Sequence, residues 1–314
     1  MSVEDGIEVI RNRRPRGARL QLGLRGVYLT HLPVSYRTLR RGDAVIGHAL
    51  YPTDALVASH WARRVGRPAV FSMMGLPDPN ALRRRRAWRS VIARAVRGAD
   101  VAVALSSTAA ERVDALFGVR CRVIHPGVDL NAFRRSADRA ASPTILCPAE
   151  IGDPRKRVAL LVAAFERLRE NHPGARLLLS RPPAGRPVPG FVDAPGVELA
   201  DLDEDDALAR AYSAAWITAL PSRDEAFGLV LVESLACGTP VVGSVDGGAS
   251  EIVDSAAVGE LVDGDDPSSL SEVLSTAIAL SQQAGIEEAC RQRAENFGID
   301  RCVEAYEELY ATLT

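Results

Sequence analysis

The 314-residue sequence predicts an α/β protein of two domains, each built around a mainly parallel sheet. Short apolar segments typical of strands alternate with amphipathic segments typical of helices along the chain. A small, polar stretch over residues 134–143 interrupts this alternation and ends in Pro143, as domain boundaries often do. The length is also sufficient for two hydrophobic cores of ordinary size.

The first half of the sequence shows the succession of elements expected of a parallel sheet. Its short apolar segments predict strands over residues 43–46, 68–74, 100–106 and 121–125. The segments between them predict helices over residues 53–65, 81–98 and 109–117.

The second half restarts the pattern after the polar stretch. Strands are expected over residues 144–147, 175–179, 216–220, 241–244 and 259–263. Helices are expected over residues 158–171, 203–215 and 227–237, and two further helices end the chain.

The composition is that of a soluble globular protein, with 47% hydrophobic and 25% charged residues. No segment has the length and apolarity of a transmembrane helix, and the acidic start lacks the features of a secretory signal. The five cysteines are scattered and form no C-x-x-C pair, which favours free thiols in a reducing cytoplasm over disulfides or a zinc site.

Charge is divided unequally along the chain. Residues 1–140 hold 25 basic and 11 acidic side chains, whereas the remainder holds 13 basic and 29 acidic ones. Either the basic half meets a polyanionic partner, or the two domains attract each other across a cleft. Lys156 is the single lysine among 38 basic residues, and a lysine is a compact charge that can approach a phosphate in a tight pocket.

Two glutamates stand where an α/β sheet usually binds its ligand. Glu225 lies in the loop after a predicted strand, and Glu233 lies in the second turn of the helix that follows. Ligands of open α/β sheets bind at the carboxyl ends of strands, so both carboxylates should face the cleft. Carboxylates accept hydrogen bonds from sugar and ribose hydroxyls, and the amides of a helix N-terminus suit a diphosphate. A helix with two solvated glutamates is the alternative.

The segment from Pro221 to Val242 resembles the E-x7-E signature of retaining GT-B glycosyltransferases, in particular glycosyltransferase family four. Further segments match the order and spacing of that family over roughly residues 43–314. They begin at Leu105, His125, Asp153, Asp246, Gly264 and Phe297. The resemblance implies two Rossmann-like domains facing a cleft, an acceptor-side domain over residues 1–138 and a nucleotide-sugar domain over 142–296. A helix over 297–314 would cross back to the first domain.

The resemblance also implies roles for single residues. Glu225 would contact the donor sugar, Glu233 the ribose and Lys156 the diphosphate, which makes Glu225 and Lys156 the catalytic candidates. The family usually has an arginine shortly before the lysine; Glu150 stands there, which leaves Arg155 or Arg157 as substitutes. The remaining donor-binding candidates are Phe227, Gly228, Leu229, Gly247 and Gly248. No metal or other cofactor is implied.

The match is poorer on the acceptor side. Residues 3–10 resemble the end of the family's first helix running into its second strand, so the first strand and its glycine-rich loop are expected to be absent. His48 matches the first of two family histidines, while Met74, before Gly75, replaces a later histidine. Either the recorded start is displaced or a partner covers the gap, or the chain is a divergent and inactive member.

The basic helix over residues 81–98 suggests a further contact. Its arginines from Arg83 to Arg97 flank an apolar stripe, a pattern that can bind anionic lipid at the inner face of a membrane. Solvated surface or a domain contact is the alternative, and no nucleic-acid-binding module accompanies the charge. His125, before Pro126, is expected to be a structural hydrogen-bonding residue.

The sequence thus predicts a retaining glycosyltransferase that uses a nucleoside-diphosphate sugar and an acceptor that is a small molecule or is linked to a lipid. A nucleotide-sugar epimerase or a sugar phosphorylase on the same fold is an alternative, although a phosphorylase would need a lysine deep in the cleft. A non-catalytic module that binds nucleotide sugars is another. Oligomerisation is left open.

Overall fold

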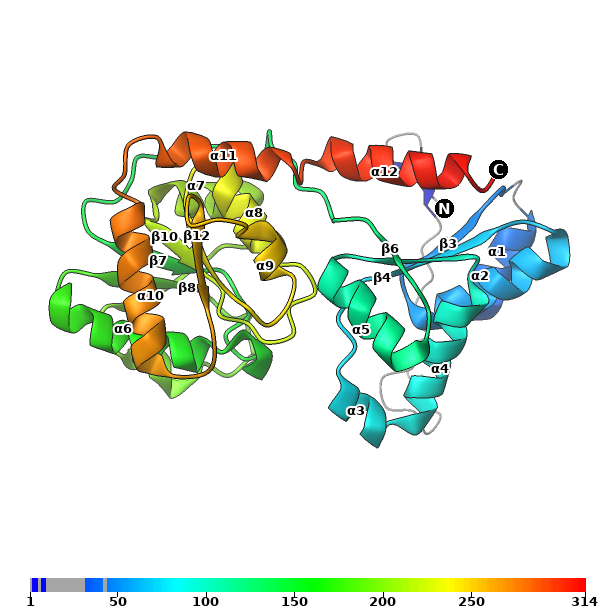
Figure 1. Cartoon of the computed structure of the whole chain (residues 1–314), viewed down its shortest axis with the longest axis horizontal. Coiled ribbons are helices and arrows are strands. Elements are labelled where there is room, and N and C mark those ends of the chain that lie inside the picture. The colour runs from blue at the N-terminus through cyan, green and yellow to red at the C-terminus, as the bar shows by residue number, and fades with distance from the viewer. Residues whose placement is uncertain (1, 5–6, 10–31, 42–43) are drawn as a thin grey trace. The chain divides into compact units, whose positions relative to one another are not determined.

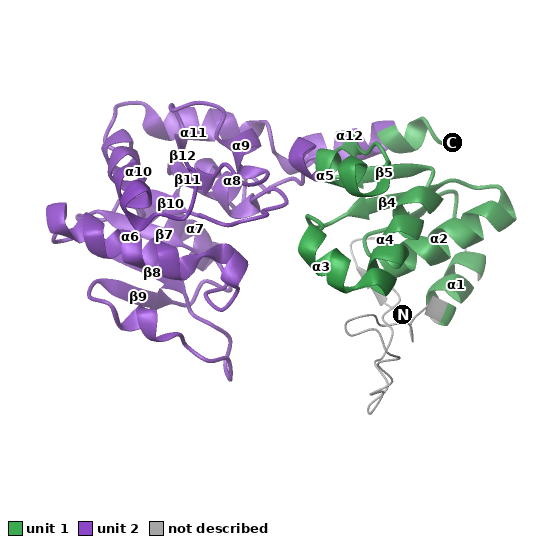
Figure 2. Ribbon diagram, turned by 60° about the horizontal axis from the view of Figure 1, so that its bottom comes forward, with its two compact units in different colours: residues 1–104, 110–123, 309–314 green, residues 105–109, 124–308 purple. Residues whose placement is uncertain are grey.

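The computed structural model describes residues 2–4, 7–9, 32–41 and 44–314, which form two compact units (Figure 2). Unit 1 comprises residues 1–104, 110–123 and 309–314, and unit 2 comprises residues 105–109 and 124–308. Residues 134–143 lie within unit 2, just before its first strand. Within the described ranges, every helix is too short or too polar to span a lipid bilayer.

Unit 1 contains a parallel sheet whose four described strands follow chain order. They are β3 (Gly47–Ala49), β4 (Ala69–Met73), β5 (Val101–Ala104) and β6 (Arg122–Val123). The helices are α1 (Leu32–Arg41), α2 (Pro52–Val65), α3 (Pro79–Arg84), α4 (Arg86–Gly98) and α5 (Ser107–Phe117). α2 packs against both α1 and α4 (Figure 1).

Three predictions for unit 1 were wrong in detail. The strand expected over 43–46 lies at β3, where Gly47 lets the backbone pass close to the ring of Trp61. The helix expected over 81–98 begins earlier, where the side chain of Asp78 caps α3, and is divided at Arg85, whose φ of −115° and ψ of 64° are not helical. A helix end was expected early in residues 3–10, but the described residues there are extended: β1 (Ser2–Glu4) and β2 (Ile7–Val9) pair antiparallel.

Unit 2 is built on a six-stranded parallel sheet in the order β12-β11-β10-β7-β8-β9. The strands are β7 (Thr144–Cys147), β8 (Arg176–Ser180), β9 (Val197–Ala200), β10 (Ile217–Ala219), β11 (Val241–Ser244) and β12 (Gly259–Val262). This is the strand order of the dinucleotide-binding Rossmann fold, with its reversal point between β7 and β10.

Helices cover both faces of this sheet (Figure 1). α6 (Val158–Asn171) packs against α10 (Pro267–Leu280), and α8 (Leu229–Ala236) packs against α7 (Asp205–Ala214) and α11 (Ile286–Glu295). The short elements are η1 (Pro154–Lys156), η2 (Gly190–Asp193) and α9 (Ala249–Ile252), and α12 (Ile299–Ala311) ends the chain.

The core of unit 2 is formed by apolar side chains of the sheet and of both helical layers, among them Ile145, Leu177, Ile217, Leu231 and Phe165. All five are fully buried, as the strands of a parallel sheet covered on both faces should be. The predicted α/β class with parallel sheets is therefore confirmed.

Candidate functional site

The candidate site lies at the carboxyl ends of β7 and β10, the two strands between which the order of the sheet reverses. Open α/β sheets leave a crevice at this point, because the connections from the two strands run to opposite faces. The loop after β7 contains η1, and the loop after β10 leads into α8.

Lys156 and Glu225 meet across these two loops. Nζ of Lys156 lies 2.7 Å from Oε2 of Glu225, and the side chains are only 24% and 18% exposed. η1 brings the lysine into place, because the carboxylate of Asp153 accepts a hydrogen bond from the Arg155 amide and caps this turn. On the other side, Asp224 has a positive φ of 50°, which turns the chain before Glu225.

The two arginines beside the lysine point to different places. Arg155 is 64% exposed and binds the carboxylate of Asp153. Arg157 is 8% exposed and adopts a positive φ of 52°. Its guanidinium donates to the carbonyl oxygens of Pro221 and Gly264, the latter at 2.9 Å, and to Oγ of Ser244 at 3.1 Å.

Arg157 therefore connects the carboxyl ends of four parallel strands through hydrogen bonds. It is itself in the loop after β7, Pro221 follows β10, Ser244 ends β11 and Gly264 follows β12. Asp265 adds an ion pair to the same guanidinium. Each carbonyl it reaches would otherwise be a loop acceptor in need of a partner.

Glu233 is held in the second turn of α8. The helix begins after Gly228, whose φ of 107° suits a residue without a side chain. The phenol of Tyr212 donates to Oε2 of Glu233 at 2.8 Å, which leaves Oε1 as an acceptor. Burial raises the pKa of Glu233; the bond from Tyr212 lowers it less, and the charge of Asp205 adds to the rise.

A glycine loop lies directly against the Glu225 segment. The amide of Gly248 donates to the carbonyl oxygen of Glu225 at 2.9 Å, and Gly247 pairs with Glu225 as in a parallel ladder. A Cβ at Gly248 would lie 2.6 Å from Cα of Phe227, so no larger residue fits without movement. Phe227 is buried below the loop, whereas Leu229 is 39% exposed.

His125 supports the same region from the side. Its Nε2 lies 3.0 Å from Oε2 of Glu251, and its ring stacks on Phe227 with centroids 5.3 Å apart. Burial would raise the pKa of Glu251, but hydrogen bonds from His125 and from the amides of Ser107 and Thr108 outweigh it and lower the pKa. The contacts are those of a structural hydrogen-bonding residue.

The acceptor-side candidates occupy separate places within unit 1. His48 contacts Oγ of Ser72 at 2.8 Å and the hydroxyl of Tyr310 at 2.6 Å, and it borders a cavity of 280 Å³. Met74 and Gly75 border a different, largely apolar cavity of 350 Å³. His48 and Met74 thus border different cavities of unit 1.

Several contacts at the site have no signal in the sequence. Tyr212, the partner of Glu233, lies in an amphipathic helix like any core tyrosine, and Glu251 reads as an ordinary helical glutamate. Arg157 follows two other basic residues, and only its position beside Lys156 draws attention to it. Among the described residues, no group of three or more His, Cys, Asp and Glu side chains could hold a metal ion.

Two family profiles match the sequence. Glycosyltransferase Family 4 matches residues 3–132, and Glycosyl transferases group 1 matches residues 197–297. The D-inositol 3-phosphate glycosyltransferase 1 of Catenulispora acidiphila is 32% identical over an alignment of 311 residues. The alignment covers 84% of this chain and 72% of that protein. The D-inositol 3-phosphate glycosyltransferase of Xylanimonas cellulosilytica is 33% identical over 246 residues, 70% of this chain and 58% of that protein.

Solved structures of other proteins share the fold. The Anabaena HepE protein in complex with UDP-glucose superposes with a TM-score of 0.76 at 19% identity, over 90% of this chain and 82% of that one. Sucrose-phosphate synthase from Thermosynechococcus elongatus gives 0.78 at 22% identity, over 90% and 77%. The family resemblance predicted from the motifs is confirmed, and the chain belongs to the group 1 glycosyltransferases of family 4, with the GT-B fold of two Rossmann-like domains.

Proposed function

We propose that this glycosyltransferase transfers a sugar from a nucleoside-diphosphate sugar to an acceptor hydroxyl and retains the anomeric configuration. The observation that carries the proposal is the contact of Lys156 with Glu225 at the reversal point of the sheet, one loop away from Glu233. An ammonium, a sugar-binding carboxylate and a ribose-binding carboxylate are the groups that such a donor requires. The HepE structures with UDP-glucose and with UDP add support from the same fold.

Each residue has a defined task in the proposed reaction. The bond between the anomeric carbon and the diphosphate oxygen breaks, and Lys156 stabilises the negative charge that builds on the leaving diphosphate. Glu225 accepts hydrogen bonds from the sugar hydroxyls and so orients the ring against the lysine. The free oxygen of Glu233 accepts a bond from the ribose and anchors the nucleotide.

Retention requires that the new bond to the anomeric carbon forms on the same face of the sugar from which the diphosphate departs. The acceptor oxygen bonds to the anomeric carbon there, and its proton passes to the departing diphosphate. Because Lys156 supplies the positive charge, the reaction as proposed uses neither a metal ion nor an organic cofactor. His48, Met74 and Gly75 are proposed as acceptor-side residues, and the names of the curated relatives make an inositol phosphate the first acceptor to test.

A panel of UDP-, GDP- and TDP-sugars tests the proposal. At least one should raise the melting temperature and should be turned over with 1D-myo-inositol 3-phosphate or other polyols, in the presence of EDTA. NMR of the product should show the anomeric configuration of the donor. An inverted product contradicts retention, and binding without hydrolysis or transfer contradicts catalysis. If no nucleotide sugar stabilises the fold, the donor site itself is wrong.

Replacing Glu233 by glutamine should lower the affinity for the active donor about 10- to 100-fold, since hydrogen bonds to a charged group contribute about 1.5–3 kcal/mol. Calorimetric titration measures this, and Glu288→Gln, an exposed change on α11, is the control.

The pH dependence separates this role from a structural one. Burial raises the pKa of Glu233 above 4.5, the ordinary value for a glutamate. Its carboxylate therefore becomes protonated at a higher pH than that of an exposed glutamate. Wild-type donor affinity should therefore fall as the pH is lowered toward 4.5, whereas the affinity of Glu233→Gln should stay level. Parallel curves for the two proteins would argue against a ribose contact.

A further inference from the structure

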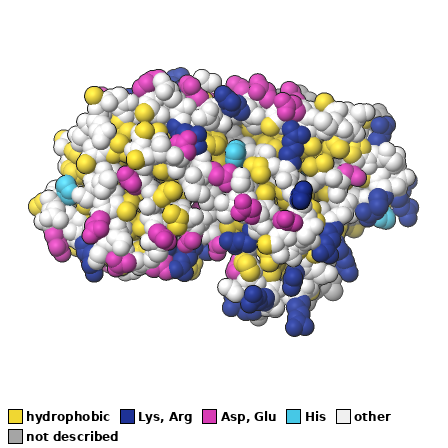
Figure 3. Space-filling view, viewed as in Figure 1, with side chains coloured by type: hydrophobic (Ala, Val, Ile, Leu, Met, Phe, Trp, Pro, Cys, Tyr) yellow, Lys and Arg dark blue, Asp and Glu magenta, His cyan; other side chains and the backbone are white. Residues whose placement is uncertain are grey.

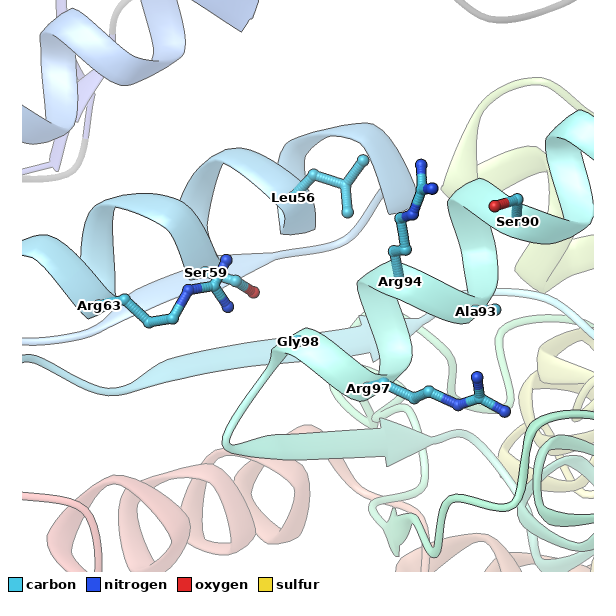
Figure 4. A pocket seen from close by; sticks show the side chains of 8 residues that line it. All are labelled: Leu56, Ser59, Arg63, Ser90, Ala93, Arg94, Arg97 and Gly98. Carbon is cyan, nitrogen blue, oxygen red and sulfur yellow. The ribbon is translucent and has the colours of Figure 1, made fainter.

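A further cavity of unit 1, partly lined by polar side chains, lies between α2 and α4 (Figure 4). It measures 450 Å³, within the size range of small-ligand sites. Its polar lining consists of Ser59 and Arg63 from α2 and of Ser90, Arg94 and Arg97 from α4. None of its described lining residues is acidic, and none belongs to the donor site.

The hydroxyl of Ser59 is the first sign that this cavity is built for a ligand. Ser59 is 2% exposed, and within the described part of the chain its Oγ has no hydrogen-bond partner. A buried polar group without a partner costs about 1–3 kcal/mol, so such groups are rare unless something else satisfies them. A ligand oxygen that accepts from Ser59 would remove this cost.

Gly98 keeps the space beside that hydroxyl open. A Cβ on Gly98 would lie 3.5 Å from Oγ of Ser59 and 3.8 Å from an Nη atom of Arg63. A hydroxyl and a guanidinium therefore both lie within 4 Å of one point at the end of α4. A side chain at residue 98 would occupy that point.

Arginine charge surrounds the cavity. Arg97 is fixed by two of its five N–H groups, which donate to the carbonyl oxygen of Phe117 at 3.1 and 2.9 Å. Arg94 leaves the helix in a different direction from Arg97 (Figure 4). Arg side chains also gather over α3 and α4 in the space-filling view (Figure 3), so this part of unit 1 is strongly basic.

Helix ends account for part of this charge. Arg63 and Arg97 lie in the last turns of their helices, where a cation is favourable even without a ligand. That explanation does not extend to Arg94, one turn earlier, or to the unpartnered hydroxyl of Ser59. Three guanidinium groups around one cavity repel one another, and a bound anion would turn that repulsion into attraction.

We propose that the cavity between α2 and α4 is a second anion site, which binds a phosphoryl group. Ser59 and Arg63 would hold it from α2 and Arg94 from α4, while Arg97, whose guanidinium is bound to the carbonyl of Phe117, adds positive charge nearby. The phosphoryl group could belong to a free phosphorylated metabolite or to the headgroup of an anionic lipid, and the chemistry of recognition is the same. The volume exceeds that of a lone phosphate and leaves room for the group that carries it.

Inorganic pyrophosphate is the probe for a free phosphate. Calorimetric titrations should use the full chain carrying Lys156→Ala, so that the donor site does not contribute. Pyrophosphate should bind, and Arg94→Gln should weaken binding at least about tenfold, because a charge-assisted contact is lost. Arg89→Gln, an exposed change on the same helix outside the cavity, should leave the affinity within about twofold.

Ser59→Ala distinguishes a serine that contacts the ligand from one with a purely structural role. The variant should melt at a higher temperature without ligand, because the unpartnered hydroxyl is gone, yet should bind pyrophosphate about fivefold more weakly. A rise in melting temperature with unchanged affinity would overturn the contact.

Vesicles identify a lipid source. Flotation with vesicles containing 30% phosphatidic acid should be compared with phosphatidylcholine vesicles, for the same variants. Binding that Arg94→Gln abolishes and Arg89→Gln does not supports the site with a lipid ligand. If both variants lose binding equally, to vesicles or to pyrophosphate, general surface charge explains the result and the proposal is wrong. Absence of binding to both probes would equally refute it.

Discussion

Replacing Lys156 by alanine should lower kcat about 100- to 1,000-fold at saturating donor, the usual effect of removing one group that stabilises charge in the transition state. The change removes the ammonium that lies 2.7 Å from Glu225 and that the proposed reaction sets against the leaving diphosphate. Steady-state rates of nucleoside diphosphate release measure it, with the donor that the panel identifies.

Arg176→Ala is the control, because Arg176 is an exposed basic residue bound to Glu198 at the amino end of β8, away from the donor site. Its kcat should stay within about threefold of wild type, as for other exposed ion pairs. A Lys156→Ala enzyme with wild-type kcat would refute the assigned role. Equal losses in both variants would indicate a general effect of lost positive charge.

Replacing Gly248 by alanine should reduce the free energy of unfolding of unit 2 by about 3 kcal/mol, the upper range for overpacking. The backbone of Gly248 has φ −72° and ψ −10°, which alanine adopts readily, so conformational preference contributes little. The added Cβ, however, would lie 2.6 Å from Cα of Phe227 and 2.8 Å from the carbonyl oxygen of Ala226. Both are backbone atoms, so the loop itself would have to move.

Urea denaturation followed by tryptophan fluorescence and far-UV circular dichroism measures this loss. Gly152→Ala is the control, because a Cβ there meets nothing within 4 Å. The control should be nearly neutral. A Gly248→Ala protein as stable as the control would show that the two loops are not packed as described.

Much of unit 2 was predictable because its strands are buried on both faces and therefore form short, continuous apolar segments. β9 was missed, since Val197–Ala200 contains Glu198 and lies at the edge of the sheet, where burial is incomplete. In unit 1 the errors fall where packing or a local backbone turn overrides periodicity, as at Gly47 and at Arg85.

The contacts of the candidate site likewise include some that the sequence predicts and some that it does not. That Lys156 and Glu225, 69 positions apart, come together follows from topology, because the carboxyl ends of neighbouring parallel strands share one edge. The bond from Tyr212 to Glu233 depends on how two helices are rotated against each other, which periodicity does not fix. Nor does periodicity fix the positive φ of Arg157, which adopts a backbone conformation that glycine usually occupies.

The contacts of Arg157 also bear on how the donor site forms and is lost. Its guanidinium reaches acceptors at the carboxyl ends of β10, β11 and β12, and these acceptors are in place only when all of these strands have assembled. A buried guanidinium with half of its partners missing is costly, so partial openings of this edge are disfavoured. Amide hydrogens of the loops after β7, β10 and β12 should therefore exchange together in one cooperative opening, and nucleotide affinity should vanish in a single step as the protein is denatured.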